Sequence, residues 1–166
     1  AGKKLNERLF TTVFEIASKK LTPGARIVEI GVGAGSVAKK FIEHGYDYSG
    51  YEPTVSLYEQ LKRQNIPVKN EFIPPLTEGD RTVDCVVMTH VMEHLTSYRE
   101  AVAACSEINR VLKPGGRLVV LAPDYTDFGM LFFDADYTHS FITTPNRIRQ
   151  LVADTGFSIQ QRIYFY

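Results

Sequence analysis

The sequence lacks net charge, long apolar runs and a set of cysteines, and each absence narrows the class of protein. Its 19 Lys and Arg residues balance 19 Asp and Glu residues, so no overall field attracts nucleic acid, acidic substrates or an anionic membrane. The longest apolar runs, such as Leu118 to Ala122, are far shorter than the roughly 20 residues that cross a bilayer. The start of the chain has no signal-peptide core. We therefore expect a cytoplasmic protein with no nucleic-acid partner and no stable membrane insertion.

The two cysteines, Cys85 and Cys105, lie within apolar patterns and do not form a C-x-x-C motif. They indicate neither a disulfide framework nor a zinc knuckle, and we expect buried free thiols. A length of 166 residues fits one domain, predicted over residues 1–166.

What the sequence does contain is an alternation of short β-rich runs and amphipathic segments, which is typical of a parallel sheet with crossover helices. An opening helix is predicted from apolar residues at three- and four-residue spacings: Leu5, Leu9, Phe10, Val13, Phe14 and Ala17. Further helices are predicted at Ser36 to His44, Val55 to Arg63, Ser97 to Leu112, and Pro145 to Asp154 with Thr144 as its cap. Strands are predicted at Arg26 to Ile30, Tyr48 to Glu52, Val68 to Phe72, Val83 to Met88, Arg117 to Ala122 and Ser158 to Tyr164.

A glycine-rich turn follows the first predicted strand, in Val28-Glu29-Ile30-Gly31-Val32-Gly33-Ala34-Gly35-Ser36. Glycines permit positive φ values and let a ligand sit against the backbone, while the helix N-terminus favours polar or anionic groups. The turn therefore indicates a cofactor site, although a lone G-x-G also occurs in ordinary loops. A dinucleotide fold has G-x-G-x-x-G or Ala at the last place. That place is Ser36 here, which weakens an NAD or FAD site and leaves it as an alternative.

A carboxylate, Glu52, stands at the end of the second predicted strand, before Pro53. At that edge it can accept hydrogen bonds from both hydroxyls of a ribose. The competing interpretation is a surface glutamate before a turn proline.

These residues together resemble the class I S-adenosylmethionine-dependent methyltransferase family, whose first motif reads acidic-x-Gly-x-Gly-x-Gly and whose second strand ends in an acidic residue. The matching residues are Glu29, Gly31, Gly33, Gly35 and Glu52. The resemblance implies that Glu29 helps hold the methionine amino group of S-adenosylmethionine through the turn, that the glycines line the cofactor and that Glu52 binds its ribose. It also implies a Rossmann-like three-layer α/β sandwich, with a mostly parallel sheet between helices, and S-adenosylhomocysteine as product.

The segment Asp84 to Leu95 reads as a buried strand followed by a short polar segment, and it resembles the branch of the family that ends this strand with Leu-Glu-His or similar. The carboxyl ends of the first and fourth strands should face each other where strand order reverses. We therefore expect Thr89 and His90 to contact the methionine part of the cofactor. The strand lacks the Asn-Pro-Pro-Tyr or Asp-Pro-Pro-Tyr common in methyltransferases of base or amide nitrogens, which also disfavours nucleic acid.

The residues His90-Val91-Met92-Glu93-His94 also spell H-x-x-E-H, which on one helix forms the zinc site of a class of peptidases. That arrangement needs a long helix and a further ligand, whereas residues 85–89 before it are β-rich. No metal site is predicted, and a zinc hydrolase through His90, Glu93 and His94 is kept only as an alternative.

A general base is needed where the methyl acceptor is a hydroxyl, and a histidine suits neutral pH because its pKa is ordinarily about 6.5. The candidates are His94 and His139. The second lies after the fifth predicted strand, where methyltransferases usually insert residues that shape the acceptor pocket, and Asp136 is expected to orient it if that segment is helical. The competing interpretation gives each histidine only a structural hydrogen bond.

The segment from Tyr125 to Phe141 is dense in aromatic and flexible apolar residues. These residues either pack against the sheet or form a lid over an apolar or ring-shaped small molecule, such as a quinol, a lipid-linked precursor or a sugar derivative. We predict methyl transfer to a small-molecule acceptor, with a preference for a hydroxyl oxygen. The alternative is a catalytically inactive cofactor-binding or interaction module of the same fold.

The family's sheet normally ends with a sixth strand, a hairpin and a seventh, antiparallel strand, whereas this chain stops at Tyr166. We expect the final antiparallel strand to be absent, either from this domain or because the chain is a segment of a longer protein. A bare sheet edge would then be covered by a second copy, giving a homodimer, or by an additional domain.

Overall fold

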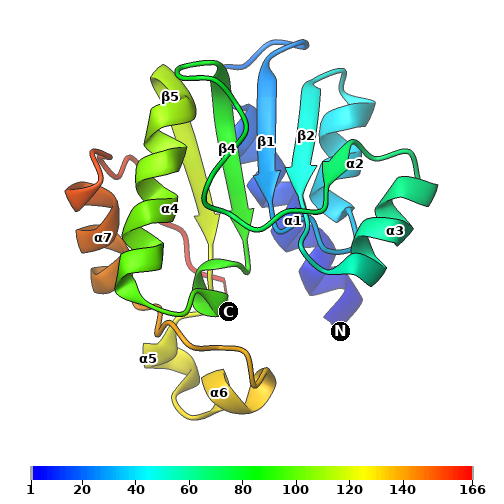
Figure 1. Cartoon of the computed structure of the whole chain (residues 1–166). Helices are drawn as coiled ribbons and strands as arrows, with labels where there is room; N and C mark the ends of the chain where they lie inside the picture. The colour runs from blue at the N-terminus through cyan, green and yellow to red at the C-terminus, as the bar shows by residue number, and fades with distance from the viewer. Residues whose placement is uncertain (1, 166) are drawn as a thin grey trace.

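Five parallel strands form the centre of the structure, a computed structural model that describes residues 2–165 (Figure 1). They run in the spatial order β3-β2-β1-β4-β5, and every neighbouring pair is parallel. Their bounds are β1 Arg26–Ile30, β2 Asp47–Tyr51, β3 Val68–Lys69, β4 Val83–Thr89 and β5 Leu112–Leu121. The chain builds outward from β1 in one direction and then returns to build in the other, so strand order reverses between β1 and β4.

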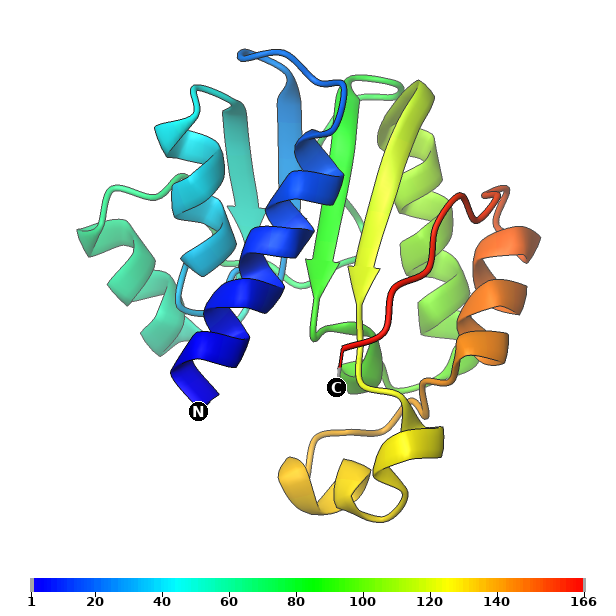
Figure 2. The ribbon, with the colours of Figure 1, turned by 180° about the vertical axis from the view of Figure 1, so that it is seen from behind.

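Helices cover both faces of this sheet, which confirms the predicted three-layer α/β architecture (Figures 1 and 2). One face packs on α1 (Gly2–Ser18), α2 (Ser36–Glu43) and α3 (Val55–Arg63), and the other on α4 (Tyr98–Val111) and α7 (Pro145–Asp154). Alternate residues of β1 serve the two cores, since Ile27 faces the first set of helices while Val28 and Ile30 face the second. Both faces are buried, as expected for an all-parallel sheet.

Several predicted bounds are confirmed because local chemistry decides them. The bounds of β1, α3 and α7 agree with the sequence pattern. The hydroxyl of Thr144 accepts a hydrogen bond from the backbone N–H of Arg147 and so caps α7, and Ser97 caps α4 in the same way through Glu100. The side chain of Leu5, which was placed on the face of the opening helix, lies outside the described side chains.

The predicted strand over Ser158 to Tyr164 is wrong, because this segment has no regular structure and β5 is the outer strand among the residues described. A strand is held in a sheet when one of its faces is buried. Here Gln160, Gln161 and Arg162 separate the two isoleucines, and all of these side chains are exposed. Figure 2 shows the segment running past β5 without joining it. That another chain or domain covers this edge stays a prediction.

Two smaller differences concern the ends of strands. The strand expected over Val68 to Phe72 has only two residues, and Leu112 opens β5 where the sequence suggested the end of a helix. The ladder between β4 and β5 runs from Val83 opposite Leu112 to Cys85 opposite Arg117, so Lys113 to Gly116 bulge out of it.

Both cysteines are free and buried, as predicted. Burial raises the pKa of the Cys85 thiol to about 12, which leaves it inert. None of the helices in the described part of the chain has the length and apolarity to cross a membrane.

The carboxyl group of Glu29 is buried in β1, with 1% of the residue exposed. Its Oε2 atom accepts a hydrogen bond of 2.6 Å from the hydroxyl of Tyr48. Burial raises the pKa of Glu29 from 4.5 to about 8, the bond from Tyr48 works in the opposite direction, and the nearby charge of Glu52 adds to the rise. A folded chain near neutral pH therefore keeps a proton that the unfolded chain has lost.

This shift predicts that stability falls as the pH rises from 4.5 to about 8, by at most about 1.4 kcal/mol per pH unit. Glu29→Gln has no such proton to lose and can still accept the hydrogen bond from Tyr48. In urea denaturation at about pH 6 and about pH 8.5, the variant should gain free energy of unfolding relative to wild type at the higher pH. Glu43→Gln, at an exposed position of α2, is the matched control. An equal response of wild type and Glu29→Gln would contradict the shift.

Candidate functional site

The carboxyl ends of β1, β2 and β4 meet at one edge of the sheet, where strand order reverses. The turn after β1, the first residues after β2 and the segment after β4 all leave the sheet there. In open α/β sheets this is the position of the ligand crevice.

The glycine turn after β1 has positive φ at Gly31, Gly33 and Gly35, at 74°, 55° and 80°. Two of the three glycines are packed closely. A Cβ on Gly31 would lie 2.2 Å from Cγ2 of Val91, and one on Gly35 would lie 2.7 Å from Cδ1 of Ile66. A Cβ on Gly33 would meet no described atom within 4 Å. The turn therefore presents its backbone to open space at Gly33, while its other glycines are required by packing.

The end of β2 holds this turn through Glu52, which is 4% exposed. The N–H of Gly33 donates to Oε2 of Glu52 and the N–H of Thr54 donates to Oε1, each over 2.9 Å. The N–H of Gly31 also donates to the carbonyl of Tyr51 over 2.8 Å. Each carboxylate oxygen has two lone pairs, so Glu52 retains an acceptor position on both oxygens beside the open glycine.

The structure places Thr89 and Val91, the two neighbours of His90 in the chain, against the same turn. Thr89 is buried at the end of β4, and its carbonyl oxygen lies 3.7 Å from the position of a Cβ on Gly31. His90 has a left-handed backbone with φ of 53°, which is uncommon for a residue with a side chain. Its N–H is bonded to the carbonyl of Leu121, and its side chain is half-exposed. Glu29 lies deeper, on the α2 side of β1, where Tyr48 holds it.

The H-x-x-E-H residues do not share a helix, so the zinc-peptidase arrangement is absent. His90 precedes a single turn of 3-10 helix, η1, which covers only Met92–His94. The β-rich character of β4 continues to Thr89 and leaves no room for a helix that would carry both histidines.

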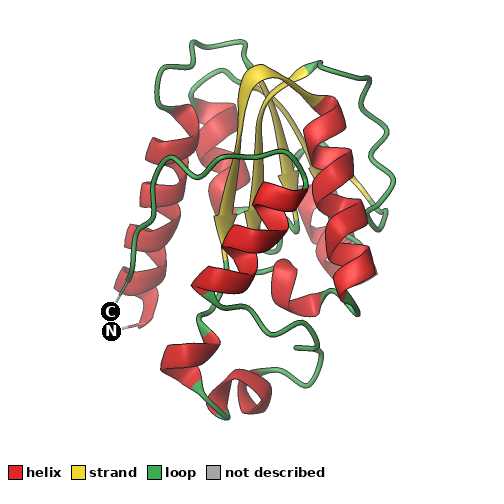
Figure 3. Cartoon of the chain, turned by 90° about the vertical axis from the view of Figure 1, so that its left-hand side faces the viewer, coloured by secondary structure: helices red, strands yellow, loops and turns green. Residues whose placement is uncertain are grey.

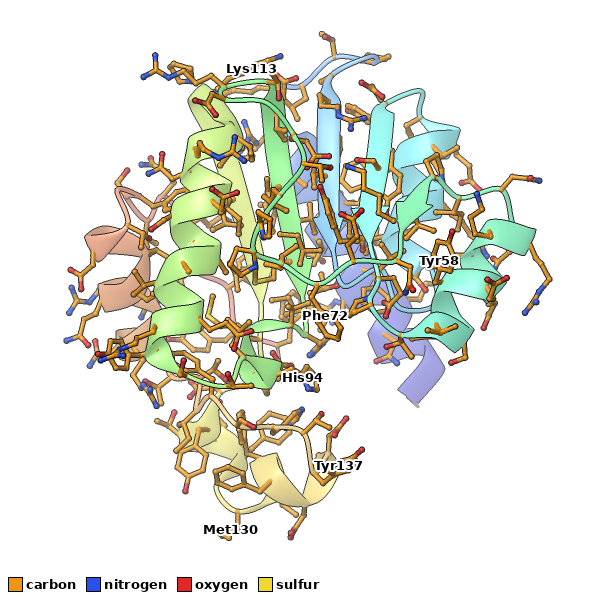
Figure 4. All side chains as sticks on the ribbon, viewed as in Figure 1. Tyr58, Phe72, His94, Lys113, Met130 and Tyr137 are labelled. Carbon is orange, nitrogen blue, oxygen red and sulfur yellow. The ribbon has the colours of Figure 1, made fainter. Side chains whose placement is uncertain are left out.

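His94 and His139 come together although 44 residues separate them in the chain. Their ring centroids are 4.9 Å apart, with planes at 65°. Figure 4 shows His94 below the end of β4, on the side that faces Tyr137 and the short helices α5 (Tyr125–Phe128) and α6 (Leu131–Ala135). Both histidines therefore stand at the edge of the sheet that carries the glycine turn.

The expected pairing of Asp136 with His139 is wrong, because α6 ends at Ala135 and the segment after it is not helical. Oδ1 of Asp136 instead accepts hydrogen bonds from the N–H and the hydroxyl of Thr138, at 2.9 and 2.7 Å. These bonds, together with the nearby His94 and His139, lower the pKa of Asp136. Thr138 Oγ1 in turn lies 2.7 Å from Nδ1 of His94, whereas Nδ1 of His139 is bonded to the carbonyl of Phe132.

A residue that the sequence did not single out for the acceptor side is Glu93, which is 1% exposed. Its carbonyl accepts the backbone N–H groups of Ser140 and Phe141, at 2.8 and 3.1 Å. This backbone clip holds the segment after α6 against η1. The H-x-x-E-H pattern named Glu93, but nothing in the sequence gives the contact with residues 139–141.

The short helices α5 and α6 project beyond the carboxyl edge of the sheet (Figure 3). Their interior is a small aromatic cluster in which Phe132, with 1% exposed, lies 4.8 Å from the ring of His139 and 5.7 Å from that of Tyr125. Other large apolar side chains of this projection remain exposed, namely Phe128, Met130, Leu131 and Tyr137. Some of the aromatic and apolar side chains of this segment therefore pack against one another, and others face outward.

The chain matches the methyltransferase domain family over residues 2–162. It is 27% identical to an uncharacterised methyltransferase of Geobacillus kaustophilus, over 92% of this chain and 75% of that one. It is also 27% identical to a ubiquinone biosynthesis O-methyltransferase of a Bradyrhizobium species, over 90% of this chain and 65% of that protein. A crystal structure of an S-adenosylmethionine-dependent methyltransferase from Archaeoglobus fulgidus has the same fold, with a TM-score of 0.80 at 20% identity over 92% and 69% of the two chains.

The fold, with a glycine turn after its first strand, defines a Rossmann-like transferase domain. The chain belongs to the methyltransferase domain family, in the S-adenosylmethionine-dependent class. This confirms the family that the glycine turn and Glu52 indicated, and with it the cofactor.

The close contact at Gly31 predicts a specific loss of stability. Gly31→Ala places a methyl group on Val91 and a side chain at positive φ, and should lower the free energy of unfolding by about 2 to 4 kcal/mol. Gly33→Ala adds only the backbone strain, about 1 kcal/mol, because its methyl group faces open space. Chemical denaturation of both variants measures the difference. Val91→Ala in the Gly31→Ala background should restore part of the loss, and equal losses in the two single variants would contradict the contact.

Proposed function

We propose that this chain transfers the methyl group of S-adenosylmethionine to a small-molecule acceptor, with a hydroxyl oxygen as the preferred acceptor atom. The observation that carries the proposal is the pairing of the open backbone at Gly33 with the buried carboxylate of Glu52. Support for an oxygen acceptor comes from the relative named as an O-methyltransferase and from the histidine pair at the same edge.

The residues present fit the cofactor. A polar ligand can approach Gly33 without meeting a side chain, and the free lone pairs of Glu52 suit the two hydroxyls of a ribose. Thr89 and His90 end the neighbouring strand, where they would contact the methionine part. Glu29 would act from beneath the turn, on the groups that the turn positions. The cofactor supplies an activated methyl group, so the protein has to align the acceptor and exclude water.

The acceptor side is assigned to His94, His139 and the exposed apolar side chains of α5 and α6. Both histidines have Nδ1 engaged in hydrogen bonds within the protein, which directs the second ring nitrogen to other partners. A lone pair at Nε2 can take the proton of a hydroxyl acceptor. Phe128, Met130, Leu131 and Tyr137 provide an apolar surface suited to a ring or a chain of carbon atoms.

Cofactor binding provides the first test. Wild type should bind S-adenosylmethionine and S-adenosylhomocysteine in calorimetric titration, and Glu52→Gln should bind both about 10- to 100-fold more weakly, since a charged acceptor and its hydrogen bonds are lost. Glu59→Gln, at an exposed position of α3, is the matched control. Absence of binding by folded wild type would overturn the proposed function.

The histidines provide the second test. His94→Gln and His139→Gln should bind S-adenosylmethionine like wild type but transfer its methyl group to a hydroxyl acceptor about 100-fold more slowly or worse. Transfer of labelled methyl groups into a metabolite extract identifies the acceptor and gives the rate. Cofactor binding by wild type without labelling of any metabolite would instead support an inactive cofactor-binding module.

A further inference from the structure

Three side chains at the acceptor side are arranged so that their donor atoms converge. Glu93, His94 and His139 each offer one ligand atom, and these atoms lie within 4.8 Å of one another. The first two belong to η1, and the third is held beside them by the backbone clip from Ser140 and Phe141 to the carbonyl of Glu93. The fold therefore brings a carboxylate and two imidazoles from distant parts of the chain to one point.

The carboxylate in this group has an unsatisfied atom. Oε1 of Glu93 lies 3.2 Å from Nδ1 of His90, but Oε2 accepts no hydrogen bond from any described residue, although only 1% of Glu93 is exposed. A buried carboxylate oxygen without a donor is energetically costly and rare. A cation bound to Oε2 would satisfy it.

The hydrogen bonds around the two histidines prepare both rings to act as ligands. A carbonyl can only accept, so His139 donates Nδ1–H to Phe132 and carries a lone pair on Nε2 in its neutral form. The only hydroxyl proton of Thr138 is directed to Asp136, so His94 donates Nδ1–H to Thr138 and likewise keeps its Nε2 lone pair. Metal-binding histidines in proteins are typically held in this way, by an outer carbonyl or carboxylate.

We propose that Glu93, His94 and His139 bind a divalent transition-metal ion, which revises the sequence-based expectation of no metal. In a tetrahedral site, two ligand atoms at about 2.1 Å from one ion are about 3.4 Å apart. The present spread of up to 4.8 Å therefore requires the most distant pair of ligand atoms to approach by up to about 1.4 Å when the ion binds. Two imidazole nitrogens favour Zn²⁺ or a similar transition metal over Mg²⁺ or Ca²⁺, which prefer oxygen ligands only.

The inferred site deepens the proposed function, on which its role in the reaction rests. Three protein ligands leave at least one coordination position for another molecule. An acceptor oxygen bound there would be fixed at the edge that carries the glycine turn. Coordination lowers the pKa of a bound hydroxyl. With their Nε2 lone pairs on the ion, His94 and His139 would not be the free bases of the proposed function, and the proton of the hydroxyl would pass to water. The acceptor class is therefore a small molecule with a hydroxyl able to coordinate a metal.

Metal binding is tested directly, without methyl transfer. Chelator-treated wild type should bind one Zn²⁺ in calorimetric titration and one Co²⁺ with visible ligand-field absorption, and should bind Mg²⁺ much more weakly. Glu93→Gln and His139→Ala should lose at least about 100-fold in Zn²⁺ affinity, and Thr138→Val, which keeps all three ligands, about 10- to 100-fold. His44→Ala removes an exposed histidine on the far end of α2 and should bind like wild type. Circular dichroism of each variant verifies folding.

Two results would overturn the site. One is the absence of stoichiometric Zn²⁺ or Co²⁺ binding by folded wild type, and the other is unchanged affinity in both Glu93→Gln and His139→Ala. Titration of the same samples with S-adenosylmethionine separates the two proposals. Cofactor binding without metal binding contradicts the metal site alone, whereas metal binding without cofactor binding contradicts the proposed function alone.

Discussion

The contact between Gly31 and Val91 is the constraint on which the arrangement of the site depends. The turn after β1 and the segment after β4 approach so closely that a single Cβ does not fit between them. The same segment continues into η1, which carries Glu93 and His94. The glycine turn and the segment that leads to Glu93 and His94 are therefore in direct contact, and packing at one glycine fixes the distance between them.

Three buried glutamates lie at or beneath the carboxyl edge of the sheet, and each is stabilised differently. Glu52 is bonded to two backbone N–H groups, and Glu29 is held by a tyrosine hydroxyl while its burial raises its pKa. Glu93 retains an oxygen with no donor in the described chain. Buried carboxyl groups in the interior of a small domain are expensive unless paired. The other buried glutamate of the described residues, Glu78, is paired with Lys69 and Arg26, so the oxygen of Glu93 is the exception.

Much of the fold follows from the sequence because local signals decide it. Strand and helix periodicity predicted the alternation of the elements, and Thr144 predicted the start of α7. The glycine turn and Glu52 predicted the edge of the sheet at which strand order reverses. The failures arise where contacts between distant segments decide the outcome. Residues 158–164 carry β-branched and aromatic residues but lack a buried face, and the link from Asp136 to His94 through Thr138 depends on how the projection folds back. No spacing in the sequence reveals the bonds from Ser140 and Phe141 to Glu93.

The two bonds from Ser140 and Phe141 to the carbonyl of Glu93 separate the histidine pair from the outward-facing part of the projection. They fix His139 to η1 at the far end of the projection, while β5 anchors its near end. The chain between these anchors, roughly residues 123–137, forms α5 and α6, and several of its large apolar side chains are exposed. Its length and composition can therefore diverge among relatives, or be redesigned, without displacing the groups at the sheet edge. Under the proposed function, the projection is the segment in which changes would alter the choice of acceptor while the glycine turn keeps its position.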